Sequence, residues 1–589
     1  MEYIGKIIYQ LRNEKKYSQA KLSKGIISTG ELSKIENGES EGSYFVLCAL
    51  MQRLGASIDK MESMISVKEY QYVYVCKMIR AALVQGEFET IHVLLDDFKK
   101  VKANVIFLQF LELAECVLQF LEGEKIENVC DNLAQALKQT QIQVEDYDNE
   151  LLCVQEVQGI NIFFYLLFLQ EKIKSETISH LVKYIEKQFP DDDERCKVYP
   201  QALWLLGMQF YKENQMELAL ACFTNARKAL VKSGSFFLLK EVLEGQNECY
   251  KQMGIAEKLE ENLNYIEVLN EISIYPDFHP ILIFLIENSR NTFVMSNEMI
   301  MEVRKLNHTT QESLAEEVCT QKSLSRIEKK KQSPTLKLVQ RIFEKLNFEK
   351  KKFQGFIISD DYHTYESVAR INTFGYFKEY DEKKKEFEKL ESKLDMQVIV
   401  NRQFVEYTKW RIEREMRQID DKQLLAYLYE TLEYTLPNCD IRNLYHLSRG
   451  EFMILNSVAN THRNLQQYQE AIHIYSTLYE LYKKSDVRLQ EQPFQMALLY
   501  INYEGVLEEA DRLEEAEKIG KEGIKYAIEC NRGDIAARIL GNLECVYEKN
   551  GDLHLAKQSM EQSYWLLYLY EHYIDAEYAL KVLKKYQEN

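Results

Sequence analysis

Apolar residues recur three and four positions apart along most of the chain, which is the spacing of one face of an α-helix. Only 7 prolines interrupt 589 residues, and this favours long helices over a sandwich of strands. The most apolar runs, such as 107–121 and 160–169, are too short or too interrupted by charge for the roughly 20 residues that a bilayer requires. The pattern predicts an all-α protein of several compact units, because 589 residues exceed what one hydrophobic core holds.

The N-terminal segment predicts four short helices in a row. A first amphipathic helix is followed by two short helices, for which Ser18 and Ser28 are suitable N-caps. The third helix, 29–36, ends at Asn37-Gly38, where a glycine readily takes the left-handed conformation. Two short helices joined by a tight turn, the second small and polar on one face, are what a DNA major groove can admit.

The string SQAKLSKGIISTGELSKIENGES resembles the Cro/repressor (XRE) type of helix-turn-helix, and the resemblance covers residues 4 to about 60. In that family the start of the recognition helix faces base edges, while neighbouring polar residues bind phosphates. The resemblance implies that the DNA contacts of this module are Gln19, Ser28, Thr29, Gly30, Ser33, Lys34 and Asn37. It also implies an internal ion pair between Arg12 and Glu36. The alternative is a small helical bundle that does not touch DNA.

Residues 299–346 repeat this module at a constant offset of 292. Arg304 and Glu328 stand where the first module has Arg12 and Glu36, so the ion pair is expected here too. The corresponding DNA contacts are Gln311, Thr320, Gln321, Lys322, Ser325, Arg326 and Lys329. Because the sequences of the two recognition helices differ, the two copies are expected to prefer different bases. A purely structural or dimerising second copy is the alternative.

Charge separates the two modules from the rest of the chain. The net charge is -18, but residues 1–60 carry +2 and residues 296–355 carry +5, so the remaining residues carry -25. Local positive charge is what a polyanionic partner meets, and net charge says little about it. The sequence predicts two basic modules in an acidic body, with double-stranded DNA as their partner.

Other chemistry is sparse. The 12 cysteines have no zinc-site spacing, and the N-terminus lacks the apolar region of a signal peptide, so a reduced, cytoplasmic protein is expected. We find no phosphate loop, no nucleophile motif and no paired-histidine metal spacing. The sequence therefore predicts no enzymatic activity and no cofactor, and no membrane partner.

Between and after the modules, apolar positions repeat about every 40 residues, which is typical of helical-hairpin solenoids. One unit, around Gly207 and Ala219, resembles a tetratricopeptide repeat, in which small residues let two antiparallel helices approach closely. Ala219 and Ala516 are 297 positions apart, close to the offset of the modules. We interpret the chain as a tandem duplication of about 290 residues.

This duplication predicts four domains and a join between the halves. Helix-turn-helix domains are expected at 1–66 and 292–355, and tetratricopeptide-like helical repeats at 67–280 and 356–589. The join falls near YPDFHP, where Pro276 and Pro280 interrupt helix before Ile281 resumes it.

A head of this type followed by such repeats resembles the peptide-pheromone regulators of Gram-positive bacteria, the group that includes Rgg, PlcR and PrgX. The resemblance implies a homodimer that reads a pseudo-palindromic operator and binds a short signalling peptide on the concave face of its repeats. Each half of this chain has about the size of one such protomer. We therefore expect a pseudo-dimer within one polypeptide, with a homodimer of the chain as the alternative.

Asparagine side chains on the inward face of the repeats can hold an extended peptide, because an amide both donates and accepts hydrogen bonds. The candidate peptide-binding residues are Asn247, Asn456, Asn460, Arg463, Asn502 and Asn542. The hypothesis is a peptide-controlled transcriptional regulator. The alternative function is a helix-turn-helix regulator whose repeats bind a protein partner instead, with a structural second head.

Overall fold

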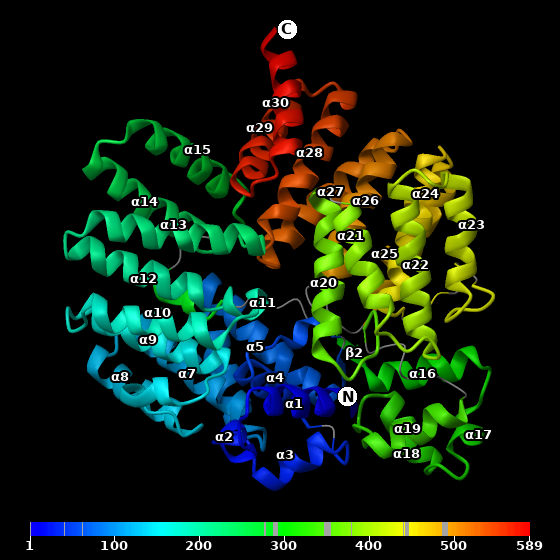
Figure 1. Ribbon diagram of the computed structural model, residues 1–589, viewed down its shortest axis with the longest axis horizontal. Coiled ribbons are helices and arrows are strands. Elements are labelled where there is room, and N and C mark those ends of the chain that lie inside the picture. Colours follow the sequence, from blue (N-terminus) through cyan, green and yellow to red (C-terminus); the bar gives the residue numbers. More distant parts are fainter. Residues whose placement is uncertain are drawn as a thin grey trace.

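The computed structural model describes residues 2–588 except 41, 62, 276–278, 287–292, 347–354, 378–379, 440, 442–443, 445–446 and 486–492. The chain folds into two small four-helix heads and two helical solenoids (Figure 1). Both heads lie along the lower edge of Figure 1, and the solenoid helices stack above them. The predicted all-α class is confirmed.

The first head is built from short helices that begin at side-chain caps. Ser18, Ser28 and Ser43 each accept a hydrogen bond from the backbone three residues on, which satisfies one of the free N–H groups at a helix start. The helices are α1 (Glu2–Glu14), α2 (Gln19–Ser23), α3 (Thr29–Glu36) and α4 (Tyr44–Arg53), followed by a 3-10 turn, η1 (Ile58–Lys60).

The first solenoid consists of antiparallel helical hairpins. Its elements are α5 (Val67–Gln85), α6 (Phe88–Lys99), α7 (Val105–Leu121), α8 (Ile126–Lys138), η2 (Val144–Asn149), α9 (Val154–Leu169), α10 (Ser175–Gln188), α11 (Asp192–Arg195), α12 (Tyr199–Lys212), α13 (Met216–Ser233), α14 (Leu239–Met253) and α15 (Ala256–Ile272). The first helices of successive hairpins, α5, α7, α9, α12 and α14, also contact one another in order. We call them the first-helix layer of this solenoid.

The second half repeats this order. The second head comprises α16 (Ser296–Leu306), α17 (Gln311–Ala315), α18 (Gln321–Glu328) and α19 (Leu336–Lys345). The second solenoid comprises α20 (Tyr362–Phe377), α21 (Tyr380–Glu391), α22 (Ile399–Glu415), α23 (Asp421–Leu432), α24 (Arg449–Asn464), α25 (Tyr468–Lys484), α26 (Pro493–Glu509), α27 (Leu513–Glu529), α28 (Gly533–Asn550), α29 (Leu553–Leu569) and α30 (Tyr573–Glu588). Its first-helix layer is α20, α22, α24, α26 and α28.

The duplication is visible in helix bounds and in single hydrogen bonds. Helices α15 and α29 have the same length and begin 297 residues apart. The buried amide of Gln109 donates to the carbonyl of Ala136 at 3.1 Å, and that of Gln403 donates to the carbonyl of Thr431 at 3.0 Å. The two solenoids are therefore the same architecture, with shifts of 292 to 297 between equivalent residues.

The segment between the halves differs from the sequence-based expectation. The helix expected to resume at Ile281 is a single 3-10 turn, η3 (Pro280–Phe284), whose residues from Ile281 onward are apolar and buried. A strand that was not predicted, β2 (Phe293–Met295), pairs in parallel with β1 (Ser63–Ile65). The other predicted join residue, Pro276, and the predicted domain start at 292 lie outside the described residues.

The heads differ in how they join the hydrophobic core. Buried residues of the first head form one cluster with residues of the second half, from Ile357 to Ile412. Buried residues of the second head form a cluster of their own with Val294. The first head is thus built into the body, whereas the described core of the second head stands apart. Within the described residues, no helix is long and apolar enough to cross a membrane.

Candidate DNA-binding heads and ligand-binding face

Helix α3 separates buried apolar residues from an exposed polar face. Leu32 and Ile35 are buried, while Ser28, Thr29, Gly30, Lys34 and Asn37 are exposed and Ser33 is half-buried. The hydroxyl of Ser28 also accepts from the backbone N–H of Glu31 at 3.2 Å, so the helix start is capped. The predicted DNA-contacting residues therefore share one accessible face, with the exception of Gln19.

A buried ion pair joins the first helix of the head to α3. Arg12 donates through Nε and Nη2 to the two carboxylate oxygens of Glu36, at 2.6 and 2.9 Å. The hydrogen bond to Glu36 raises the pKa of Arg12. The predicted ion pair is confirmed. Gln19 donates its amide to Glu36 at 2.7 Å, so it belongs to this network, and its contact with phosphate stays a prediction.

The second head repeats this network. Arg304 donates to both carboxylate oxygens of Glu328 at 2.6 and 2.9 Å, and Gln311 donates to Glu328 at 2.6 Å. On α18 the side chain of Thr320 caps the helix. The predicted contacts Thr320, Gln321, Lys322, Arg326 and Lys329 are exposed, and Ser325 is half-buried. The two heads thus share the same buried network, while the exposed residues of α3 and α18 differ. Two copies that prefer different bases require this combination.

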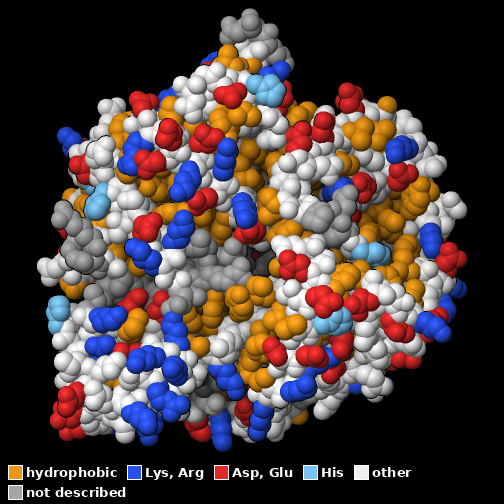
Figure 2. All heavy atoms as spheres, turned by 180° about the vertical axis from the view of Figure 1, so that it is seen from behind, with side chains coloured by type: hydrophobic (Ala, Val, Ile, Leu, Met, Phe, Trp, Pro, Cys, Tyr) orange, Lys and Arg blue, Asp and Glu red, His pale blue; other side chains and the backbone are white. Residues whose placement is uncertain are grey.

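Positive charge is concentrated on the second head. Most of its exposed cations lie on α18, on the turn that follows it, and on α19: Lys322, Arg326, Lys329, Lys331, Lys337, Arg341 and Lys345. Lys305 lies on α16. Figure 2 shows Lys and Arg side chains gathered at the lower left, over this head. Such a patch favours contact with a phosphate backbone.

Two segments of the chain, residues 8–61 and 300–352, match the family model described as helix-turn-helix. Each of these two segments is thus similar to a helix-turn-helix domain. Since helix-turn-helix domains place a recognition helix in the major groove, the two matches support a DNA-binding transcriptional regulator as the class of this protein. None of the curated proteins matches.

Solved structures that are similar to this chain each cover about half of it. PlcR of Bacillus thuringiensis in complex with the peptide PapR7 and DNA is 17% identical, with 48% of this chain and 98% of that chain covered at a TM-score of 0.33. ComR from S. thermophilus in complex with DNA and its signalling peptide ComS is 11% identical, with coverages of 50% and 99% and a TM-score of 0.30. The SHP pheromone receptor Rgg2 of Streptococcus dysgalactiae is 12% identical, with coverages of 49% and 99% and a TM-score of 0.28.

The first helix-turn-helix head is fastened to its own solenoid by buried polar groups. Arg53 at the end of α4 donates to Glu156 of α9 at 2.7 Å, and both side chains are 1% exposed or less. The neighbouring Gln52 donates to Glu194 at 2.8 Å. Burial raises the pKa of Glu194 to about 7, against the lowering effect of Lys197. These two interactions were not predicted from the sequence, because the residues that each of them joins are more than 100 positions apart.

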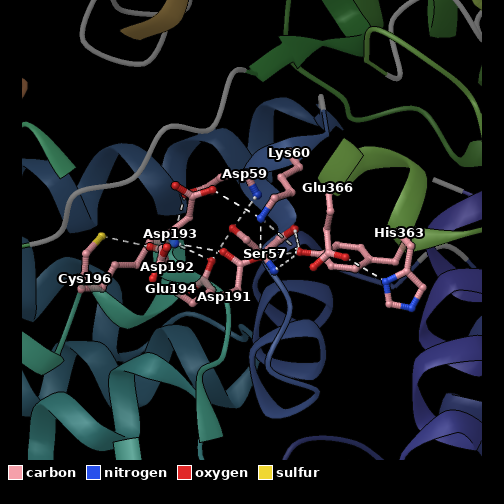
Figure 3. Close-up of polar contacts among 12 residues, drawn as sticks. Ser57, Asp59, Lys60, Asp191, Asp192, Asp193, Glu194, Cys196, His363 and Glu366 are labelled. Atoms are coloured by element: carbon pink, nitrogen blue, oxygen red, sulfur yellow. Dashed lines mark hydrogen bonds and ion pairs between the residues drawn. The ribbon is translucent and has the colours of Figure 1, made fainter. Parts of the chain in front are cut away.

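A polar junction extends this attachment to the second half (Figure 3). Lys60, which follows the first helix-turn-helix head, forms an ion pair with Asp191 at the start of α11. Ser57 donates its hydroxyl to Glu194 of α11 at 2.6 Å. Tyr362, at the start of α20, accepts from the backbone N–H of Ser57 at 2.7 Å and donates to Asp191 at 2.9 Å. Three parts of the chain are thereby joined: the first head, the first solenoid and the second solenoid.

The second helix-turn-helix head lacks the equivalent of these ties at the described positions. Glu344 and Lys345 stand where the first head has Gln52 and Arg53, and both are exposed. Glu344 accepts from Gln340, and Lys345 donates to the carbonyl of Glu316, so both bonds stay within the head. This difference leaves the second head less constrained by the body than the first.

The predicted peptide-binding residues fall into two groups. Asn456, Asn460 and Arg463 lie on α24, Asn502 lies on α26 and Asn542 on α28, so five of the six share the first-helix layer of the second solenoid. Asn247 lies apart from them, buried on α14 of the first solenoid.

Several of these side chains join neighbouring helices. Asn502 donates to the buried Asn456 at 2.9 Å, and Asn542 donates to the carbonyl of Ile501 at 3.1 Å. Asn460 and Arg463 are half-buried, and Arg463 forms a bidentate ion pair with Glu509. Contact with a peptide stays a prediction for all six, and Asn460 and Arg463 are the more accessible of the group on α24.

One carboxyl group on the same layer was not predicted. Glu504 of α26 is fully buried, and neither of its oxygens has a hydrogen-bond partner among the described residues. Burial raises its pKa well above the ordinary value, while Asn542 and Arg463 nearby act in the opposite direction. It stands where the first solenoid has Gly207, 297 positions earlier. A comparison of the two halves could have identified this residue, because an acid replaces a glycine that packs between helices.

A small cavity of about 20 Å³, roughly the space of one water molecule, lies among α20, α21, α22 and α24. Its walls carry apolar groups together with two cations, and the lining residues are Phe356, Ile371, Asn372, Lys383, Phe404, Tyr407, Thr408, Arg411 and Met453. Both cations share Glu415: the Lys383 ammonium lies 2.6 Å and the Arg411 guanidinium 3.4 Å from its oxygens. Burial lowers the pKa of Lys383.

The first solenoid has no cation at the positions equivalent to Lys383 and Arg411. Ile91 and Val117 are fully buried there, in place of Lys383 and Arg411. The surrounding apolar positions are retained, since Phe110 becomes Phe404. An apolar core in one copy has thus been replaced by a cation-bearing cavity in the other.

Proposed function

We propose that this chain is a sequence-specific transcriptional regulator that binds its operator as an intrachain pseudo-dimer and is controlled by a short peptide on the second solenoid. The observation that carries DNA binding is the pair of heads with the same buried ion-pair network and different exposed recognition helices. Each head would present the N-terminal end of α3 or α18 to the major groove.

Contacts between the solenoids support the pseudo-dimer. The shift of 297 relates Gly234 to Asn531 and Phe236 to Gly533. The backbone N–H of Phe236 donates to Asn531 at 2.7 Å, and the N–H of Gly533 donates to the carbonyl of Gly234 at 3.0 Å. Phe236 thus contacts the counterpart of Gly234, and the counterpart of Phe236 contacts Gly234 itself. This reciprocal pairing is the pattern of an isologous two-fold interface. Covalent linkage makes this association intramolecular.

Selection from a random duplex library tests the DNA-binding part with the full chain. We expect one asymmetric operator whose half-sites lie about 34 Å apart, one turn of DNA. Lys34→Ala should relax one half-site and Arg326→Ala the other, each weakening binding by about 5- to 150-fold, the equivalent of roughly 1–3 kcal/mol.

Lysines at the end of the first helix of each head provide controls: Lys15 directly follows α1, and Lys305 lies on α16. Lys15 and Lys305 are exposed and lie away from α3 and α18 in the sequence, so Lys15→Ala and Lys305→Ala should leave base preference unchanged. Binding should fall steeply with salt in every variant, because phosphate contacts release counterions. Full operator affinity after Arg326→Ala would contradict DNA contact by the second head.

Peptide control rests on the first-helix layer of the second solenoid. The cavity lies at one end of this layer, and Asn460 and Arg463 lie further along it on α24. A peptide that binds better in one arrangement of the heads would shift the population toward that arrangement and so change DNA affinity. The less constrained second head is the part that such a shift would move.

A random heptapeptide display library, panned on the full chain, tests this part. Selected peptides should change operator affinity by about 5- to 150-fold, the usual range of allosteric coupling. Asn460→Ala and Arg463→Ala should each weaken peptide binding at least tenfold, while Lys484→Ala, an exposed change on α25, should not. Failure to select any peptide that depends on these residues would favour a protein partner instead.

A further inference from the structure

The segment that joins the two halves does not lie on the surface. From Ile281 to Leu285 each side chain is 3% exposed or less, and these residues belong to the same core cluster as the first solenoid. They follow the last hairpin of that solenoid, which ends with α15 at Ile272. They are therefore an additional stretch of chain packed onto a completed array of helices.

This segment contacts four consecutive helices of the first-helix layer. His279 packs against Phe120 of α7, with ring centroids 5.2 Å apart. Phe284 packs against Tyr165 of α9 at 5.3 Å and against Trp204 of α12 at 6.2 Å. One aromatic residue from each of α7, α9 and α12 thus packs against the segment, as expected for a ligand that runs along a solenoid and touches successive repeats.

The fourth helix binds the main chain of the segment. Arg80 of α5 donates through Nε to the carbonyl oxygen of Leu285 at 2.8 Å. Its guanidinium also lies over the ring of Phe110, 4.5 Å from the centroid, which fixes its orientation. A side chain that binds a backbone carbonyl, combined with pockets for apolar side chains, is how proteins recognise short peptides.

The second solenoid carries different residues at these four positions. Arg80, Phe120, Tyr165 and Trp204 correspond to Asn372, Arg414, Asn460 and Ile501. Asn372 and Phe404, the counterparts of Arg80 and Phe110, line the cavity of the second solenoid. The place that holds the Leu285 carbonyl in the first solenoid thus corresponds to part of a cavity in the second.

We propose that residues 279–286 are a tethered ligand, and that the first-helix layer of the first solenoid is a site for a short apolar peptide that is filled by the chain itself. In consequence, a chain takes up at most one external peptide, on the second solenoid, and that peptide is more polar than the tethered segment. This consequence rests on the proposed function, whereas the tethered site itself does not.

A labelled copy of the segment tests the proposal. The probe is a dye-labelled peptide with the sequence of residues 279–286, HPILIFLI, preceded by Lys-Lys-Gly for solubility. The full chain with Ile281→Ser, Ile283→Ser and Phe284→Ser has lost the apolar contacts of its own segment. We expect this variant to bind the probe saturably, one per chain, and at least tenfold more tightly than the unaltered chain does, measured by fluorescence anisotropy.

Matched controls separate a site from a merely exposed apolar surface. Ile274 is 42% exposed near the same segment, so Ile274→Ser should bind the probe no better than the unaltered chain. A scrambled probe should bind the triple variant at least tenfold more weakly, and Arg80→Ala in the triple variant should weaken probe binding at least tenfold. A folded triple variant that ignores the probe, or binds the scrambled one equally, would overturn the proposal.

A milder variant covers the case in which the triple variant does not fold. Phe284→Ala weakens the tethered segment while the probe keeps its phenylalanine, so probe binding should still exceed that of the unaltered chain severalfold. Equal binding by a folded Phe284→Ala variant would also overturn the proposal. The assay contains no DNA, so its outcome is independent of whether the heads bind an operator or an external peptide controls them.

Discussion

At the scale of single residues, each head depends on charges placed inside a small core. Arg12 and Glu36 are 24 positions apart, and the Glu36 carboxylate receives hydrogen bonds from both Arg12 and Gln19. Such groups are tolerated inside a protein only when they are paired and hydrogen-bonded. The exposed residues of α3 do not take part in this buried network. Their counterparts on α18 can therefore differ in sequence without loss of the ion pair.

Removing one member of the buried pair should destabilise the head strongly. Arg12→Met leaves Glu36 charged and largely without its partner, which costs about 3–5 kcal/mol in buried pairs. The double variant Arg12→Met with Glu36→Leu should recover most of this loss, because neither side then buries a charge. Hydrogen exchange of the α3 amides in increasing urea measures the stability of the head in the single and in the double variant. A single variant as stable as the double variant would contradict the expectation.

The second head carries a strained residue where the first has a glycine. Gly38 has a φ of +74°, and Lys330 at the equivalent position has a φ of +59°, with the same backbone bonds closing the helix end. A side chain in this left-handed region costs roughly 1–2 kcal/mol. Lys330→Gly should therefore stabilise the second head by up to about 1 kcal/mol, after the extra backbone entropy of glycine is subtracted.

Thermal unfolding with and without this change measures the effect. Lys329→Gly is the matched control, because Lys329 has a φ of -82° and gains nothing from glycine. A gain from Lys329→Gly equal to that from Lys330→Gly would contradict the strain argument.

At the scale of elements, the same four-helix head is attached in two ways. In the first head the end of α4 enters the body through Arg53 and Glu156, and in the second head the end of α19 bonds only within the head at the described equivalent positions. Parallel pairing of β1 with β2 then brings the strand that follows the first head beside the strand that precedes the second.

This asymmetry predicts unequal effects of equivalent substitutions. Arg53→Met should loosen the first head by about 3–5 kcal/mol, because Glu156 is left buried and unpaired. Lys345→Met should change stability by less than about 0.5 kcal/mol, since its side chain is exposed. Hydrogen exchange of the α1–α4 and α16–α19 amides reports each head separately. Equal loosening of both heads would contradict the difference in attachment.

At the scale of the whole molecule, two halves face each other across contacts between equivalent segments. Asn531 accepts from the N–H groups of both Phe236 and Phe237, at 2.7 and 2.8 Å. Helix α15 also packs against α29, where Tyr265 meets Trp565 edge-on at 5.8 Å. These contacts set the relative placement of the solenoids and, through them, of the heads.

Loosening this interface should weaken operator binding without touching a DNA contact. Asn531→Ala leaves two buried backbone N–H groups without their acceptor, a cost of about 1–3 kcal/mol for each group left unsatisfied. The operator affinity should fall, because both heads must then be positioned at an entropic cost. Asn550→Ala, an exposed change on the neighbouring α28, is the control and should leave affinity unchanged.

Light scattering then decides between an intrachain pseudo-dimer and a dimer of chains. We expect one chain on one full operator, because the interface between equivalent solenoids is already made within the chain. A stable complex of two chains with four heads on one operator would overturn the pseudo-dimer.

The sequence by itself determined the local and periodic features of this protein. Helical spacing, serine caps and the offset of 292 predicted the heads, the repeated halves and the position of the exposed residues on α3 and α18. The Arg12–Glu36 pair was predicted only through the family resemblance. These features depend on neighbours within a few turns of helix or on a comparison of the chain with itself, so they can be read without three-dimensional information.

The tertiary structure alone decided which distant residues meet. The ties of Arg53 to Glu156 and of Tyr362 to Asp191, the cavity beside Lys383 and the burial of 281–285 on the first solenoid all join positions far apart in the chain. A run of apolar residues such as ILIFL predicts that the segment is buried, but it does not predict which other residues the segment packs against. That partner is selected by packing, and here packing placed the join of the halves on the face where the resemblance led us to expect a peptide.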